Sequence, residues 1–199
     1  LKYPTTSVFD PVLSECAYRW WAPSAENLNR RPTILDPFCG GSVRGVVASL
    51  LGYEYHGFDL RQEQVDANYQ QWRDIGQSGV QPNWYVGDSK DIDKNLRNLR
   101  VELRASERFD GTPLKPPEKF DFIFSCPPYY DLEKYCDDPD DLSNMSWDDF
   151  CVTYRQVIAK SCELLADNRF ACFVVGPVRD KRGMHRGFVN ETIDAFTSA

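Results

Sequence analysis

The sequence predicts one α/β domain built on a doubly wound, mostly parallel sheet. Short apolar runs alternate with amphipathic segments in the order α-β-α-β-α-β-(α)-β-α-β-α, which is typical of parallel sheets with right-handed crossovers. Acidic residues or prolines follow four of the predicted strands, at the carboxyl edge where open α/β sheets bind ligands. The length of 199 residues and the apolar content of 42% are sufficient for one folded core.

The first predicted helix covers residues 10–22 and precedes the first strand, at 33–35. Asp10 is a suitable N-cap and Pro11 fits the first helical position. Six apolar residues at helical spacing form a stripe on this helix: Val12, Leu13, Cys16, Ala17, Trp20 and Trp21.

A glycine turn follows the first strand and leads into a helix over 43–51, which ends at Gly52. The turn reads Asp36-Pro37-Phe38-Cys39-Gly40-Gly41-Ser42. Glycines let the backbone approach a ligand, and the amino end of a helix favours anionic groups, so the arrangement is typical of a nucleotide-type site. It matches neither GxGxxG nor a Walker loop, so a dinucleotide or nucleoside triphosphate is not indicated. A tight βα turn without a ligand is the alternative.

Two further acids end the second and third predicted strands. Residues 53–59 form the second strand and end at Asp59, a place where an acid typically binds ribose hydroxyls. The third strand, at 84–86, is followed by Asp88 and Ser89. Asp88 has a second interpretation, as the N-cap of the next helix.

The fourth predicted strand, at 120–124, is followed by Ser125-Cys126-Pro127-Pro128-Tyr129-Tyr130. Two prolines cannot continue a central strand, so the chain leaves the sheet as a rigid extended turn. Carbonyls beside proline can accept hydrogen bonds from a guest, and Tyr129 offers a flat face. The pattern favours a planar ring that carries an amino group, such as a nucleobase, because base–aromatic stacking contributes roughly 1–3 kcal/mol. A proline-rich loop that only closes the strand is the alternative.

The last third of the chain alternates acidic and basic segments. An acid-rich stretch over 131–141 would repel phosphates. A helix is expected from Ser146 to about residue 166, then a strand over 170–176 and a helix over 188–197. Between the last two lies a basic, glycine-containing loop that we expect to meet a phosphate backbone. Its four cations of interest are Arg179, Lys181, Arg182 and Arg186.

Composition excludes several classes of protein. The net charge of −7 argues against a dedicated nucleic-acid binder, although an enzyme can still handle nucleic acid locally. Seven cysteines include no CxxC pair and the two histidines are far apart, so we expect no metal site and a reducing, cytoplasmic compartment. No apolar run approaches the ~20 residues of a membrane helix. The start at Leu1 and the abrupt end suggest one catalytic domain, residues 1–199, from a longer chain.

Two of these motifs together resemble the S-adenosylmethionine-dependent amino-methyltransferases of DNA, over nearly the whole chain. Residues 36–42 are similar to the family's cofactor motif DPFxGxG, and Cys126-Pro127-Pro128-Tyr129 is similar to its catalytic [D/N/S]PP[Y/F/W] motif. The sequence of residues 125–133 is most similar to that of phage and bacterial methylases that modify cytosine at N4 or adenine at N6. The resemblance implies a Rossmann-like class I methyltransferase fold, whose last strands would lie beyond this chain.

The resemblance also implies roles for individual residues. The residues implied to bind S-adenosyl-L-methionine are Thr5, Asp36, Pro37, Phe38, Gly40, Gly41, Ser42, Asp59, Leu60, Asp88 and Ser89. The catalytic residues would be Ser125, Cys126, Pro127, Pro128 and Tyr129, with DNA contacts from Tyr130, Arg179, Lys181, Arg182 and Arg186. The implied mechanism is direct methyl transfer to a base that has flipped out of the duplex, without a metal.

Two positions depart from the family's pattern. Ser42 replaces the second motif glycine, and Gly41 stands one place early. Cys126 replaces Asp, Asn or Ser, and a thiol is a weak acceptor for the target amine. The amine would then depend more on the Pro127 carbonyl or on Ser125.

Several alternatives stay open. Cys126 could be a nucleophile for cytosine C5 methylation, although that family places proline before the cysteine. RNA guanine and protein glutamine methyltransferases use a similar platform. The chain could also be a cofactor-binding subunit whose partner subunit or domain recognises DNA.

Overall fold

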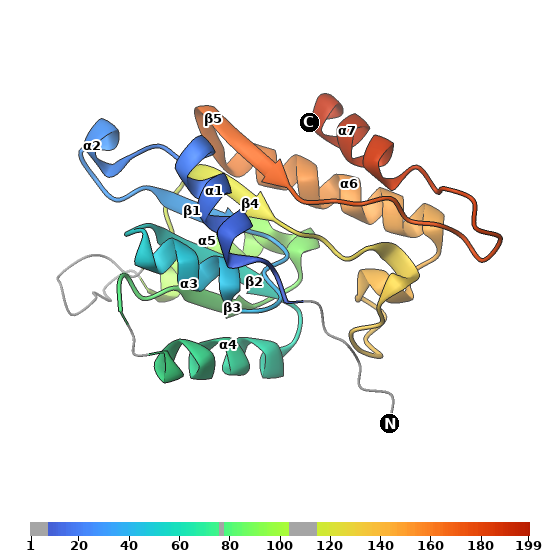
Figure 1. The fold of residues 1–199 in the computed structure, drawn as a ribbon, viewed down its shortest axis with the longest axis horizontal. Helices are drawn as coiled ribbons and strands as arrows, with labels where there is room; N and C mark the ends of the chain where they lie inside the picture. Colours follow the sequence, from blue (N-terminus) through green and yellow to red (C-terminus); the bar gives the residue numbers. More distant parts are fainter. Residues whose placement is uncertain (1–7, 76–77, 104–114) are drawn as a thin grey trace.

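The computed structural model describes residues 8–75, 78–103 and 115–199. In these residues five parallel strands form one sheet in the order β3-β2-β1-β4-β5 (Figure 1). The strands are β1 (Thr33–Asp36), β2 (Glu54–Asp59), β3 (Asn83–Val86), β4 (Phe120–Ser125) and β5 (Leu165–Phe173). This confirms the predicted doubly wound, parallel α/β sheet.

Helices cover both faces of the sheet. On one face α1 (Pro11–Trp21), α3 (Val43–Leu50) and α4 (Gln62–Asp74) pack on a core that includes Tyr18, Tyr55 and Trp84. On the other face α5 (Ile92–Glu102) and α6 (Trp147–Leu164) pack on Leu35, Phe58 and Ile123. Successive strand residues point to opposite faces, which is why neighbours such as Phe122 and Ile123 lie in different cores.

The remaining elements are short, apart from α7 (Phe188–Ser198), which packs along α6 (Figure 1). The short ones are α2 (Ala25–Leu28) and the 3-10 turns η1 (Ser89–Asp91), η2 (Tyr130–Leu132) and η3 (Leu142–Asn144). A third apolar cluster joins α6, α7 and the loop after β4, with Phe150, Tyr154 and Phe188 at its centre. Within the described residues, no helix is long and apolar enough to cross a membrane.

The sheet order brings the glycine turn and the proline motif together. β1 pairs directly with β4, with Ile34 opposite Phe122, so the loops that follow these strands are neighbours at one edge. β2 pairs with the other side of β1, and Asp36 lies opposite Gly57. A Cβ at Gly57 would lie 2.7 Å from Cys39 Cβ, so only glycine there lets the glycine turn pack against the sheet.

Several local predictions are confirmed and two are corrected. Asp10 and Ser146 cap α1 and α6 with their side chains, and Gly52 has the left-handed φ of 82°. The predicted apolar stripe of α1 includes the buried Ala17, but most of the stripe lies off the buried face. Val12 and Trp20 are exposed at 67% and 73%, because the face that packs is Ser14, Ala17 and Tyr18.

The predicted strand over 170–176 begins earlier, because β5 starts at Leu165, where α6 ends. A register shift between Phe120 and Phe122 lets this longer strand follow β4. Residues 167–169, whose sequence Asp167-Asn168-Arg169 is typical of a turn, form the irregular part of this strand, where Asn168 has a left-handed φ of 56°.

Candidate active site

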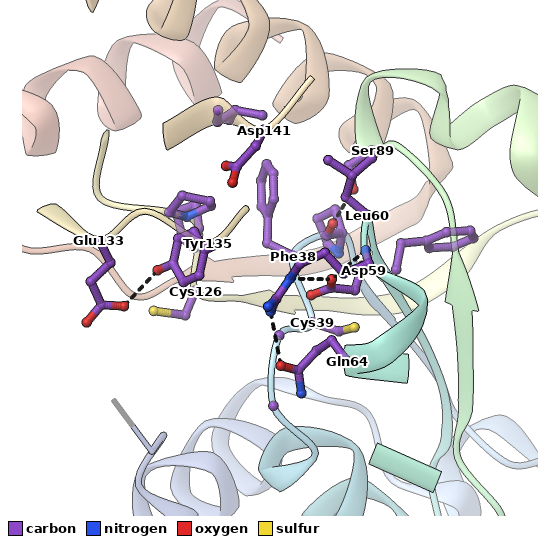
Figure 2. A pocket seen from close by; sticks show the side chains of 18 of the residues that line it. Phe38, Cys39, Asp59, Leu60, Gln64, Ser89, Cys126, Glu133, Tyr135 and Asp141 are labelled. Carbon is purple, nitrogen blue, oxygen red and sulfur yellow. Dashed lines mark hydrogen bonds and ion pairs between the residues drawn. The ribbon is translucent and has the colours of Figure 1, made fainter. Parts of the chain in front are cut away.

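A cavity of about 430 Å³ lies at the carboxyl edge of the sheet, between the loops after β1 and β4. Figure 2 shows Asp59, Leu60 and Gln64 on one side of it and Cys126, Glu133 and Tyr135 on the other. We call residues 37–44, 59–64 and 87–89 the glycine-loop wall, and residues 126–142 the proline-loop wall. Nine of the residues implied to bind cofactor line the cavity: Pro37, Phe38, Gly40, Gly41, Ser42, Asp59, Leu60, Asp88 and Ser89.

The glycine turn presents open backbone to the cavity. Gly40 has a φ of 48°, a conformation that favours glycine, and no atom lies within 4 Å of a Cβ built at Gly40 or Gly41. The turn is fastened from behind by α4. The Asn68 side chain donates to the Gly40 carbonyl at 2.7 Å, and the Ser42 hydroxyl donates to Gln71 Oε1.

The acid at the end of β2 is held by the start of α4. Asp59 Oδ1 accepts a hydrogen bond from the Arg61 backbone N–H at 2.9 Å, and the Arg61 guanidinium lies 3.6 Å away. Burial raises the pKa of Asp59, and Arg61 opposes this rise. The Arg61 side chain also donates to Gln64, which in turn donates to Asn68, so one chain of hydrogen bonds joins Asp59 to the glycine turn.

The loop after β3 closes the same wall. Asp88 accepts from the Lys90 backbone N–H at 2.9 Å and so caps η1, as its second interpretation predicted. The Asp88 residue nevertheless lines the cavity. The Ser89 hydroxyl donates to the Pro37 carbonyl, which ties this loop to the glycine turn.

On the proline-loop wall, Cys126, Pro127, Pro128 and Tyr129 line the cavity. The Tyr129 hydroxyl donates to the Val174 carbonyl at 3.2 Å and lies 3.8 Å from Cys126 Sγ. Burial raises the pKa of both side chains, so Cys126 is a neutral thiol and Tyr129 a neutral phenol. The ring of Tyr129 is therefore anchored at its hydroxyl end.

The acid-rich stretch continues this wall, a contribution that the sequence analysis missed. The Tyr135 hydroxyl donates to Glu133 Oε2 at 3.0 Å, and both residues line the cavity beside Cys126 (Figure 2). The Lys90 ammonium joins this stretch to the glycine-loop wall through ion pairs with Asp140 and with Asp88. Tyr135 among acids was the available signal, because a lone aromatic residue in an acidic loop often packs inward.

Asp36 and Ser125 lie behind the cavity rather than in it, since both are fully buried. Asp36 Oδ1 accepts from the Ser125 hydroxyl at 2.7 Å and from the Phe38 N–H at 3.2 Å. Asp36 Oδ2 accepts from the Tyr55 hydroxyl and from Arg44 Nε, each at 2.7 Å. This corrects the expectations that Asp36 contacts the cofactor and that Ser125 accepts the target amine. The Asp36 carboxylate and the Ser125 hydroxyl already form hydrogen bonds with each other and with buried neighbours.

Arg44 completes this buried cluster, and its side chain holds the glycine turn from below. Its guanidinium donates to the carbonyls of Phe38 at 2.7 Å and Cys39 at 3.0 Å. Burial alone would lower the pKa of Arg44, but the Asp36 carboxylate outweighs it and raises the pKa. The guanidinium therefore remains charged within the protein.

The residues implied to contact DNA divide into two groups. Tyr130 is buried against Trp147 and Phe150, which corrects the expectation that its ring meets nucleic acid. The Arg186 guanidinium lies 4.8 Å from the Tyr130 ring centre and 5.4 Å from that of Trp147. It therefore forms cation–π contacts within the protein. The cations that remain exposed are Arg179, Lys181 and Arg182.

Arg179 pairs with His185 across a short antiparallel bridge, so the basic loop is a hairpin. Thr5 lies outside the described residues. Among the residues that the structure describes, no group of three or more His, Cys, Asp or Glu side chains gathers as a metal site would require.

Sequence reasoning also missed a polar stripe on α4. Gln64, Asn68 and Gln71 repeat at spacings of four and three residues, on the face that supports the glycine turn. The repeated amide side chains beside Val65 and Trp72 were the signal that could have identified this face.

No protein-family model and no curated protein sequence matches this chain. Solved structures do share its fold. A SAM-dependent methyltransferase from Agrobacterium tumefaciens has a TM-score of 0.59 at 14% identity, with 94% of this chain and 50% of that chain covered. A protein named as a putative rRNA-methylase, from Clostridium thermocellum, has a TM-score of 0.58 at 12% identity, with 97% of this chain and 84% of that chain covered.

TrmN from Thermus thermophilus has a TM-score of 0.53 at 16% identity, with 85% of this chain and 39% of that chain covered. This chain spans between 39% and 50% of the length of the first three neighbours. At these identities the likeness establishes a shared Rossmann-like class I fold, and the activity is argued from the site.

Proposed function

We propose that this chain transfers a methyl group from S-adenosylmethionine to the exocyclic amine of adenine (N6) or cytosine (N4) in DNA. The observation that carries the proposal is the shared cavity. The glycine turn after β1 and the Cys126-Pro127-Pro128-Tyr129 motif after β4 both line it. A methyl donor and a flat, amine-bearing acceptor can therefore occupy one cavity.

The glycine-loop wall has the chemistry to hold the cofactor. The open space in front of Gly40 and Gly41 admits a ligand against the backbone. Asp59, at the end of β2, would accept hydrogen bonds from ribose hydroxyls, and Asp88 with Ser89 would face the adenine. When bound, the cofactor supplies an electrophilic methyl group on its sulfonium sulfur.

The proline-loop wall would position the acceptor. Tyr129, anchored through its hydroxyl, offers its ring as a stacking surface for a flipped base. The carbonyl of Pro127, with the Cys126 thiol beside it, would accept a hydrogen bond from the target amine and orient its lone pair. The rate would come mainly from this alignment.

The raised pKa of Cys126 disfavours the C5 alternative, because attack at a cytosine ring carbon needs a thiolate. The exposed cations of the hairpin, Arg179, Lys181 and Arg182, support a nucleic-acid substrate. An RNA base is the second candidate acceptor, because two structural neighbours are named as rRNA methylases.

The test is methyl transfer from labelled S-adenosylmethionine to DNA, RNA and protein, followed by mass spectrometry of the nucleosides. We expect N6-methyladenine or N4-methylcytosine in DNA, and a loss of at least about 100-fold in Tyr129→Ala with cofactor binding retained. The Cys126→Ser variant should stay active. Label only in RNA would move the assignment to the second candidate.

Formation of 5-methylcytosine that Cys126→Ser abolishes would replace the proposal with the nucleophilic mechanism. Cofactor binding without transfer to any acceptor would instead support a non-catalytic subunit.

A further inference from the structure

A fully buried carboxylate joins the two loops that form opposite walls of the cavity. Asp36 lies at the end of β1, and Ser125 at the end of the neighbouring strand β4. The Ser125 hydroxyl donates to Asp36 at 2.7 Å and accepts from the Phe38 N–H at 3.1 Å. One side chain from the proline-loop strand thus contacts both the acid and the backbone of the glycine turn.

The other side of the same carboxylate holds the glycine turn in place. Arg44 Nε and the Tyr55 hydroxyl donate to Asp36 Oδ2, and the Arg44 guanidinium reaches the carbonyls of Phe38 and Cys39. The side chains of Asp36, Tyr55 and Arg44 are buried, with Arg44 the most exposed at 4%. Because water cannot replace these bonds, a shift of one loop is transmitted to the other.

We propose that Asp36 and Ser125 are positioning residues that couple the glycine turn to the proline motif. In this arrangement, cofactor binding at the glycine turn fixes the Cys126–Tyr129 segment for the acceptor. The inference rests on the proposed function and adds to it the means by which the two reactants are aligned. Ser125 is adjacent to Cys126 in the chain, so a small displacement of Ser125 moves the acceptor platform directly.

The test compares Ser125→Ala with Ser161→Ala. Ser161 is also fully buried, but its hydroxyl donates to the Val157 carbonyl at 2.7 Å inside α6, away from the cavity. The first measurement is the affinity for S-adenosylhomocysteine by titration calorimetry. The second is hydrogen–deuterium exchange of residues 126–142 with and without that compound, and the third is kcat on the DNA substrate.

We expect S-adenosylhomocysteine to slow exchange in 126–142 of the wild type and of Ser161→Ala, and to lose this effect in Ser125→Ala. Affinity should stay within about threefold, because Arg44 and Asn68 still hold the glycine turn. The kcat should fall about 10- to 100-fold, as expected when a reacting group is misplaced. Tyr55→Phe, which removes one donor to Asp36, should show the same pattern more weakly. It replaces Ser125→Ala as the test variant if Ser125→Ala does not fold.

Equal protection of 126–142 in Ser125→Ala and Ser161→Ala, with equal kcat, would overturn the coupling and leave the proposed function standing. A wild-type chain that binds no S-adenosylhomocysteine would overturn the proposed function and, with it, this inference.

Discussion

The glycine-loop wall and the acidic part of the proline-loop wall face the same cavity but are held by different contacts. The glycine turn is fixed by buried bonds, in which the side chains of Arg44 and Asp36 are 5% and 0% exposed. The acidic stretch is joined to the glycine-loop wall by surface ion pairs, in which the side chains of Lys90 and Asp140 are 31% and 52% exposed. The glycine-loop wall is therefore the more rigidly held of the two, which fits the cofactor side of the proposed function.

The two kinds of contact differ in how much they stabilise the fold. Removing one partner of a buried ion pair costs about 3–5 kcal/mol, because the other charge stays buried without a partner. An exposed pair contributes about 0–1 kcal/mol, since water and salt screen it. Substitutions can therefore weaken each wall separately, and the size of each loss shows how much the removed contact contributes.

The largest effect is expected for Arg44→Met. The variant leaves the Asp36 carboxylate buried without its cation, so the free energy of unfolding should fall by about 3–5 kcal/mol in urea denaturation. Arg19→Met is the matched control, since Arg19 forms an exposed pair with Glu15 and should cost less than about 1 kcal/mol. Equal effects of the two substitutions would remove the basis of the comparison.

A smaller effect is expected for Asn68→Ala. Loss of the hydrogen bond to the Gly40 carbonyl loosens the glycine turn, so the affinity for S-adenosylhomocysteine should fall about 5- to 10-fold in calorimetry. Gln70→Ala on the same helix is the control. The Gln70 side chain donates to Asp74 and accepts from Arg73 on the exposed face of α4, so its loss should leave the affinity unchanged. An unchanged affinity in Asn68→Ala would show that α4 does not support the site.

The smallest effect is expected for Asp140→Asn, on the proline-loop wall. This variant removes the carboxylate that pairs with Lys90, so the free energy of unfolding should change by less than about 1 kcal/mol. The difference in unfolding free energy between the wild type and the variant should shrink at high salt, because salt screens the Lys90–Asp140 pair. A loss above about 2 kcal/mol would mean that this wall is as firmly built as the other.

The fold and the meeting of the two motifs could be predicted because both follow from strand order. An acid, a glycine turn and a proline motif at strand ends must share one edge of a parallel sheet. The direction of a side chain could not be predicted in the same way. Asp36 and Ser125 stand within the expected motifs, yet they point behind the cavity because Arg44 and Tyr55 offer buried donors there.

The acidic stretch was harder to interpret, because it has no period that links it to a strand or helix. Its place at the cavity depends on contacts distant in sequence, such as the pairing of Lys90 with Asp140. The buried face of α1 was predicted incorrectly for a related reason, because it too depends on contacts distant in sequence. Tyr18 packs on Phe122 and Phe124 of β4 and donates to the Arg44 carbonyl at 3.0 Å, which turns Trp20 outward.

Arg186 marks the boundary between the exposed tip of the basic hairpin and its packed base. Arg186 is held over Tyr130 and Trp147, while Val178 at the other end of the hairpin is buried beside the same cluster. The intervening residues 179–185 touch solvent along most of their length. Segments of another length or charge could therefore be grafted between Val178 and Arg186 without disturbing the apolar cluster on which these two residues rest.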